Sequence, residues 1–173
     1  MTQAVLLTGT IGVGKTTVAE AISESLHDAH QLHALIDLDW LAQLYPAPDE
    51  ADPYNTNLAA DNLAAVWRNF HTAGARRAVM AATVESAEQL GEIRRALPDA
   101  EFTVVLVTAS SDSVHGRIAT RDRGRLRNDF LACTNALATR IESAGLHEFA
   151  IENDGRLPDE AANEILQKLG WLP

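Results

Sequence analysis

Eight residues near the start of the chain have the composition and spacing of a phosphate-binding loop. Residues 9–16 read Gly-Thr-Ile-Gly-Val-Gly-Lys-Thr and match the pattern G-x-x-x-x-G-K-[ST] in full. In this pattern the glycines let backbone N–H groups point at phosphate oxygens, the lysine reaches the β- and γ-phosphates, and the hydroxyl ligates magnesium. We therefore expect ATP and Mg²⁺ to bind through Gly9, Thr10, Gly12, Val13, Gly14, Lys15, Thr16 and Thr17.

Two alternatives remain for this loop: a chance glycine-rich turn, and a degenerate loop that binds nucleotide without turnover. An apolar strand pattern precedes the loop and a helical pattern follows it, which is the context that the motif needs. Lys15 is also one of only two lysines in the chain, so a generic solvated lysine explains its position poorly.

Asp37 and Asp39 follow the second predicted strand. Residues i and i+2 of a strand point the same way, and ligands of open α/β sheets bind outside the carboxyl ends of the strands. Phosphoryl transfer to an alcohol needs a group that orients the hydroxyl and takes its proton. We expect Asp37 to act as the catalytic base or to help hold magnesium, and Asp39 to fix the acceptor. Alternatively, Asp39 caps a helix that starts near Trp40.

Five of the twelve arginines lie within residues 117–127. Such a local basic cluster in an acidic chain predicts a lid that closes over triphosphate, stabilises charge in the transition state and excludes water. Arg121 is the candidate catalytic arginine, and Arg117 is the candidate for stacking on adenine. The alternatives are a nucleic-acid patch and a solvated face paired with Asp112, Asp122 and Asp129.

Four further polar residues give weaker signals. Asn153 begins an Asn-Asp-Gly turn after the last strand and is a candidate adenine contact, or part of an ordinary turn. Glu85 follows the third strand and is a candidate for substrate or magnesium binding, or a favourable carboxylate at a helix start. Asn57 and Arg68 lie on or near the helix after a Pro- and Asp-rich loop and are candidate acceptor contacts.

Alternating strands and helices must position these residues. Short apolar runs predict strands at 4–8, 32–38, 78–84, 102–108 and 147–151, and helical patterns separate them. This alternation predicts an α/β fold with a parallel sheet covered by helices. The strand at 102–108 ends without an acidic residue, which favours the acidic pair after the second strand as the magnesium helper. With 173 residues we expect one domain over 1–173, with the lid at about 117–128.

Composition excludes several classes of protein. The net charge of −10 argues against non-specific nucleic-acid binding, which needs a broad basic surface. The single cysteine, Cys133, rules out an intramolecular disulfide framework. No apolar run is long enough for a signal peptide or a membrane span. We expect a cytoplasmic protein, monomeric or homodimeric, whose partner is a small-molecule acceptor and which binds neither nucleic acid nor membrane.

With these motifs the chain resembles the small P-loop kinases related to nucleoside monophosphate kinases. This group holds shikimate kinase, gluconate kinase, adenylylsulfate kinase and chloramphenicol phosphotransferase. The resemblance covers nearly the whole chain and rests on four segments, residues 9–16, 37–39, 117–127 and 151–155. It implies a P-loop NTPase three-layer sandwich, with five parallel strands in the order 2-3-1-4-5, helices on both faces and an arginine lid.

The resemblance also implies where the ligands bind. The nucleotide base would lie between Arg117 and the loop near Asn153, and the acceptor between the end of the second strand and the helices around residues 40–70. Residues 80–85 lack the Gly-Gly-Gly motif of shikimate kinase, which argues against shikimate. We expect a kinase that phosphorylates a hydroxyl of a sugar acid, an adenylylsulfate-like compound or an antibiotic. The alternatives are a nucleoside or nucleotide kinase and a non-catalytic nucleotide-binding regulatory protein.

Overall fold

Five parallel strands form the centre of the molecule. The computed structural model describes residues 1–121 and 124–172, except for the side chains of residues 121–127. The strands pair in the order β2-β3-β1-β4-β5, which confirms the α/β class and the strand order that the resemblance implied. They are β1 (Thr2–Thr8), β2 (Ala34–Asp37), β3 (Arg77–Ala81), β4 (Ala100–Thr108) and β5 (Phe149–Glu152).

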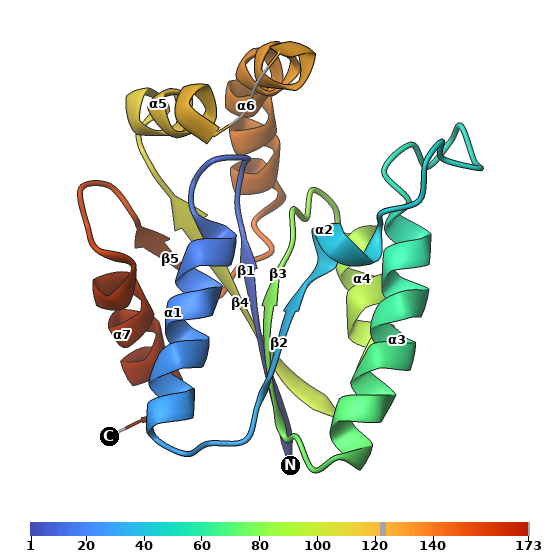
Figure 1. Cartoon of the computed structure of the whole chain (residues 1–173), viewed down its shortest axis with the longest axis vertical. Helices are drawn as coiled ribbons and strands as arrows, with labels where there is room; N and C mark the ends of the chain where they lie inside the picture. The colour runs from blue at the N-terminus through green and yellow to red at the C-terminus, as the bar shows by residue number, and fades with distance from the viewer. Residues whose placement is uncertain (122–123, 173) are drawn as a thin grey trace.

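Helices cover both faces of this sheet (Figure 1). They are α1 (Lys15–Asp28), α2 (Leu38–Leu41), α3 (Thr56–Thr72), α4 (Ala87–Ala96), α5 (Ser111–Arg121), α6 (Gly124–Ala144) and α7 (Pro158–Leu169). Helices α1 and α7 pack together on one face, and α3 and α4 pack together on the other. Helix α5 and the first half of α6 lie beyond the carboxyl ends of the strands (Figure 1).

Two apolar cores follow from the alternation of side chains along each strand. Val5 and Leu7 point toward α1 and α7, whereas Ala4 and Leu6 point toward α3 and α4. Because helices cover both faces, the central strands are continuous apolar runs. Complete burial of a side chain such as Leu6 contributes about 1.5–3 kcal/mol to stability. These cores fix the strands, and the strands in turn fix the loops at their carboxyl ends.

The loops at the carboxyl edge of the sheet carry most of the predicted site. This edge is where β1 leads into the glycine-rich loop, β2 into α2, and β3 into residues 82–86. Residues 153–157 follow β5 at the same edge. No helix in the part of the chain that the structure describes is long and apolar enough to cross a membrane.

The second strand is shorter than predicted. The sequence predicts a strand over 32–38, whereas β2 has four residues and α2 begins at Leu38. Asp37 is the N-cap of α2, because its Oδ1 accepts a hydrogen bond from the Asp39 backbone N–H at 2.9 Å. The alternative in which Asp39 caps a helix near Trp40 is therefore wrong.

Candidate active site

Two glycines of the glycine-rich loop lie so close to other atoms of the protein that a larger residue would not fit. Gly9 has φ +148°, and a Cβ atom there would lie 2.3 Å from the carbonyl oxygen of Val107. Gly14 has φ +98°, and its Cβ would lie 2.6 Å from Asn153 Nδ2. Gly14 is also the N-cap of α1 and makes no side-chain capping bond. The first N–H groups of α1 thus start at the loop, where the helix dipole favours an anion.

Lys15 lies beneath the loop and is only 8% exposed. Its Nζ donates to the carbonyl oxygens of Gly9 at 2.9 Å and of Thr10 at 3.1 Å. These bonds satisfy part of a buried ammonium group, which would otherwise carry a large desolvation cost. The lysine is therefore held as a fixed positive charge in the concave side of the loop.

Thr16 and Asp37 meet although 21 residues separate them. The Thr16 hydroxyl donates to Asp37 Oδ2 at 2.7 Å, and Asp37 Oδ1 accepts from the Asp39 N–H. One carboxylate therefore connects the start of α1 with the start of α2. Hydroxyl and carboxylate oxygens are ligand types that Mg²⁺ uses, commonly together with phosphate oxygens and water. Among the described residues no group of three or more His, Cys, Asp or Glu could hold a metal ion.

Arg117 and Asn153 hold the outer side of the glycine-rich loop. From α5, Arg117 Nη1 donates to the carbonyl oxygens of Val13 at 3.0 Å and of Gly12 at 3.3 Å. Its Nη2 donates to the Asn153 carbonyl at 2.7 Å, and Asn153 Nδ2 donates to the Val13 carbonyl at 2.8 Å. Asn153 is 5% exposed, and its Oδ1 finds no partner among the described residues. The structure thus brings these two candidates for the nucleotide base together beside the loop.

Asp154 connects the loop after β5 with the start of α5. Its Oδ2 accepts from the Ser110 N–H at 3.0 Å. Hydrogen bonds from the Ser110 and Ser113 hydroxyls and from the Ser110 N–H, together with the charge of Arg117, lower the pKa of Asp154 below its usual value despite partial desolvation. This carboxylate therefore stays ionised and holds the two loops together at neutral pH.

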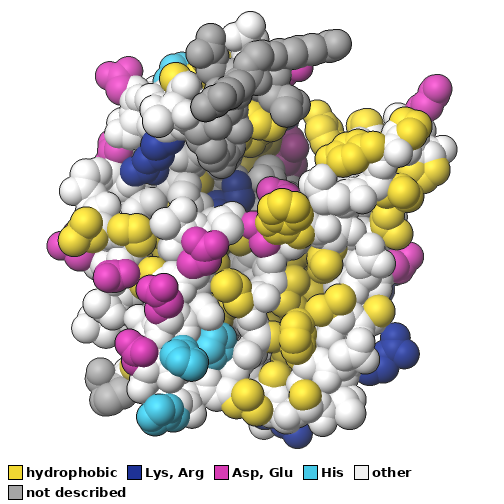
Figure 2. Space-filling model, in the orientation of Figure 1, with side chains coloured by type: hydrophobic (Ala, Val, Ile, Leu, Met, Phe, Trp, Pro, Cys, Tyr) yellow, Lys and Arg dark blue, Asp and Glu magenta, His cyan; other side chains and the backbone are white. Residues whose placement is uncertain are grey.

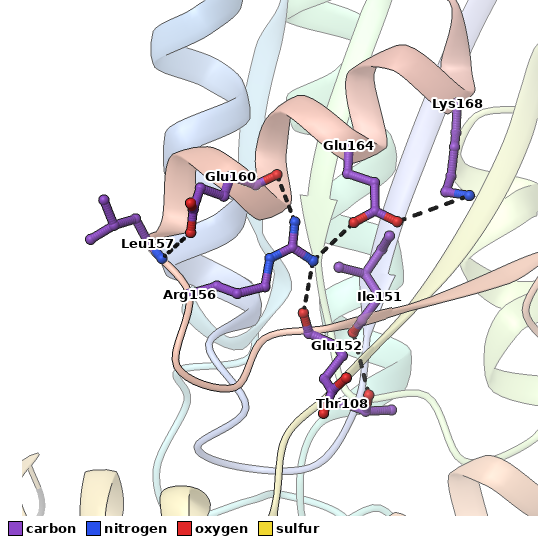
Figure 3. A network of polar contacts seen from close by, with 8 residues as sticks. All are labelled: Thr108, Ile151, Glu152, Arg156, Leu157, Glu160, Glu164 and Lys168. Carbon is purple, nitrogen blue, oxygen red and sulfur yellow. Dashed lines mark hydrogen bonds and ion pairs between the residues drawn. The ribbon is translucent and has the colours of Figure 1, made fainter.

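A network around Arg156 fixes the far side of the same loop (Figure 3). Arg156 Nη1 donates to the Glu152 carbonyl at 3.0 Å and to Glu164 Oε2 at 2.9 Å, and Nη2 donates to the Glu160 carbonyl at 2.9 Å. The Leu157 N–H donates to Glu160 Oε2 at 2.9 Å. The loop that carries Asn153 is therefore tied to the first turns of α7.

Glu85 lies at the carboxyl edge and has an ion-pair partner that the sequence did not reveal. The Arg140 Nε atom, on α6, lies 2.7 Å from Glu85 Oε2. The neighbouring Val84 N–H donates to Thr8 Oγ1 at 3.1 Å, which keeps this segment beside the last residue of β1. Arg140 escaped prediction because it stands alone in a helical pattern, well after the arginine cluster.

Thr134 was also missed. The buried Thr10 hydroxyl donates to the Thr134 carbonyl at 3.0 Å, and the Thr134 hydroxyl lies 3.3 Å from His115 Nε2. These contacts tie the glycine-rich loop to α6, and α6 to α5. No sequence signal could have found them, because a helix carbonyl is available at every residue type.

The remaining predicted residues lie in different places. Asn57 is exposed in the first turn of α3, and its N–H donates to Asp52 Oδ2 at 3.0 Å. Arg68 is eleven residues further along α3, about 16 Å along the helix axis at 1.5 Å per residue. Because α3 runs away from the carboxyl edge, the structure does not bring Arg68 to the other candidates. The side chain of Arg121, residues 122–123 of the predicted lid and the side chains of residues 124–127 lie outside the described residues, and the described backbone on either side belongs to α5 and α6.

The sheet order and the glycine-rich loop together define a P-loop nucleotide-binding fold of the kinase type. The family described as AAA domain, AAA_18, matches residues 5–133, and the chain belongs to this family. Members of such P-loop families bind nucleotide. No curated protein matches the sequence at a significant level.

Solved structures give the same fold at low sequence identity. The tunicamycin resistance protein of Deinococcus radiodurans superimposes with a TM-score of 0.69 at 14% identity, over 98% of this chain and 96% of the other. The shikimate kinase of Bacteroides thetaiotaomicron gives 0.67 at 15% identity, over 97% and 98%. The Mycobacterium tuberculosis APS kinase, solved with AMPPNP and APS, gives 0.62 at 21% identity, over 98% of each chain. At these identities the likeness establishes the fold and leaves the acceptor open.

Proposed function

We propose that this protein is an ATP- and Mg²⁺-dependent kinase that transfers the γ-phosphoryl group to a hydroxyl of a small molecule. The contact that carries the proposal is the 2.7 Å hydrogen bond from Thr16 to Asp37, which sets the acidic pair beside a phosphate-binding loop. This contact places a hydroxyl and a carboxylate where they can hold Mg²⁺ beside the phosphates, with Asp39 two residues further along the chain. The loop also suits a nucleotide, because α1 begins directly after Gly14, where its first N–H groups and the helix dipole favour an anion.

Each residue then has a chemical task. The glycine-rich loop, with Gly12, Val13 and Gly14, binds the phosphates, and Lys15 balances charge at the transferred group. Thr16 and Asp37 hold Mg²⁺, which when bound neutralises charge on the phosphate oxygens and orients them. Asp37 is also the candidate base that takes the proton of the acceptor hydroxyl, and Asp39 orients the acceptor.

Three sets of groups complete the assignment. Arg117 and Asn153 flank the base, and Thr10 and Thr17 complete the nucleotide contacts. Arg121 is assigned to charge that develops during transfer. Glu85 and Asn57 remain candidates for acceptor binding, whereas the position of Arg68 on α3 argues against it. We also propose that residues 1–173 act as one kinase domain, with the lid at about 117–128.

The test measures ADP release from ATP and Mg²⁺ across sugars, sugar acids, antibiotics, nucleosides and nucleotides. An acceptor that stimulates release in the wild type and not in Lys15→Ala supports the proposal and names the acceptor class. Stimulation by nucleosides or nucleotides alone would indicate a nucleoside or nucleotide kinase. Tight ATP binding without a phosphorylated product from any compound would indicate a regulatory nucleotide-binding protein.

A further inference from the structure

The segment on the acceptor side of the site, residues 38–67, concentrates negative charge. Residues 38–67 contain five carboxylates and no Lys or Arg, a formal charge of −5 (0 minus 5), which is half of the chain's net −10. The carboxylates are Asp39, Asp49, Glu50, Asp52 and Asp61. Hydrogen bonds from the N–H groups of Asn57 and Thr56 and from the Thr56 hydroxyl lower the pKa of Asp52, against the desolvation that would raise it. This segment is therefore strongly negative at neutral pH.

The same segment exposes aromatic side chains. Trp40 is 76% exposed, and Tyr45 and Tyr54 are 75% and 79% exposed. The other two tryptophans, Trp67 and Trp171, are both buried. In Figure 2 hydrophobic side chains gather over the loop between α2 and α3. Aromatic surface of this kind, beside a site, is typical of ligand binding.

Hydrogen bonds hold this loop in place, so the exposure is not that of a loose segment. Asn55 is 4% exposed, and its Nδ2 donates to the carbonyl oxygens of Ala42 at 3.0 Å and Leu44 at 2.9 Å. Asn62 Nδ2 donates to the Leu41 carbonyl at 2.8 Å. Tyr54 precedes Asn55 in the sequence, and Tyr45 follows Leu44. The bond between Asn55 and Leu44 therefore holds the two segments that carry these tyrosines side by side. Aromatic side chains on a fixed backbone bind with a smaller entropy cost.

One described arginine at the carboxyl edge already has an acidic partner. Arg140 is the described arginine that reaches Glu85 at the carboxyl edge, and the two form an ion pair at 2.7 Å. An anionic acceptor would therefore approach a surface of like charge on the side of residues 38–67. A cationic acceptor would meet both the carboxylates and the aromatic faces, which attract cations.

We propose that the acceptor is an amine-bearing, cationic alcohol, recognised by Trp40, Tyr45 and Tyr54 together with the carboxylates of residues 38–67. This inference rests on the proposed kinase function and narrows it, since it disfavours sugar acids and adenylylsulfate-like compounds. The ammonium group binds at the aromatic and acidic surface, and a separate hydroxyl reacts. The hydroxyl oxygen bonds to the γ-phosphorus, the bond from that phosphorus to the bridging oxygen of ADP breaks, and the hydroxyl proton passes to Asp37.

The test uses alcohols that share a carbon skeleton and differ in charge. One set is phenylalaninol, N-acetylphenylalaninol and 3-phenyllactate, and a second is glucosamine, N-acetylglucosamine and gluconate. Calorimetric titration of the full chain with Mg²⁺ and a non-hydrolysable ATP analogue gives the affinities. We expect the amine to bind at least about 10-fold more tightly than the acid in one set or both, with a ratio that shrinks between low and high salt because the charges are exposed.

Variants locate the preference. Trp40→Ala should weaken amine binding several-fold, while Trp40→Phe keeps an aromatic face and most of the affinity. Glu50→Lys should lower the amine-to-acid ratio, whereas Glu20→Lys, the same charge change on the exposed side of α1, should leave it unchanged.

Each other outcome has one meaning. Equal affinities within both sets, a preference for the acids, or no amine binding overturns the acceptor inference. If the ATP analogue binds in those cases, the proposed kinase function is untouched. If the analogue itself does not bind, the proposed function fails first.

Discussion

The nucleotide half and the acceptor half of the candidate site are built from different kinds of contact. In the nucleotide half, Thr10 reaches α6, and Arg117 and Asn153 reach the carbonyl of Val13, across 104 to 140 residues of sequence. In the acceptor half, Asn55 and Asn62 bind carbonyls no more than 21 residues away. The contacts of the nucleotide half form only when distant parts of the chain pack together, whereas those of the acceptor half join residues that are near in sequence. A local loop can change its specificity without disturbing the sheet, which is how one fold comes to serve many acceptors.

The largest effect should come from the nucleotide half. Lys15→Ala removes the buried ammonium and should lower kcat/KM for ATP turnover by about 10³-fold or more, because this ammonium balances charge on the transferred phosphoryl group. Lys168→Ala is the matched control, since the other lysine lies on α7 beside Glu164, outside the site. Steady-state ADP release measures both. Similar activities for the two variants would remove Lys15 from the catalytic machinery.

The next effect tests the contact that joins the two halves. Asp37→Asn keeps an acceptor for the Asp39 N–H but removes the negative charge beside Thr16, and should lower kcat by about 10²-fold. Asp159→Asn is its matched control, because Asp159 is an exposed carboxylate in the first turn of α7, outside the site. Kinetics and circular dichroism of both variants check this. An unimpaired Asp37→Asn would show that Asp37 serves only as a helix cap.

Substitutions of two buried asparagines, Asn153 and Asn55, distinguish the nucleotide half from the acceptor half most directly. Asn153→Ala should raise the KM for ATP by about 10-fold, which corresponds to about 1.4 kcal/mol, and leave the acceptor KM unchanged. Asn55→Ala should raise the acceptor KM by a similar factor and leave the KM for ATP unchanged. Each variant should also lose about 1–3 kcal/mol of stability, because carbonyl groups lose their partners. Two-substrate kinetics with urea unfolding measures both effects. If both variants changed both KM values equally, the two halves would be one coupled unit.

The smallest effect concerns acid stability. The pKa values of Asp154 and Asp52 are both lowered by folding, so each stabilises the protein above its unfolded pKa, and that stabilisation is lost as pH falls through the folded pKa. Asp154→Asn and Asp52→Asn should therefore each make the fall in stability below about pH 4 shallower. Urea unfolding from pH 6 to pH 3 measures this. Unchanged acid slopes would mean that these hydrogen bonds do not favour the ionised form.

Sequence predicted the parts of the molecule that local chemistry determines. The glycine-rich loop follows from a motif whose residue types have no substitute, and the alternation of apolar runs is sufficient for the parallel sheet. The nearness of Asp37 to Thr16 also follows, because parallel strands end at one edge. The sequence predicts the helix that carries Arg68. It does not give the direction of α3, along which each residue adds about 1.5 Å of distance from that edge.

The contacts that sequence could not predict depend on packing between distant helices. Arg140 meets Glu85 because α6 packs against Leu106 of β4 and so reaches the segment that follows β3. Trp40 is exposed because α2 has only four residues and buries Leu38 instead. Neither outcome has a signature in composition or spacing.

The bonds from Arg117 and Asn153 to the loop carbonyls have a consequence for the opposite side of the same peptide groups. A trans peptide is planar, so its N–H points away from its C=O. Holding the carbonyls of Gly12 and Val13 outward therefore directs the N–H groups of Val13 and Gly14 inward before any ligand arrives. The entropy cost of orienting these two donors is met when the chain folds, so phosphate binding finds them preorganised.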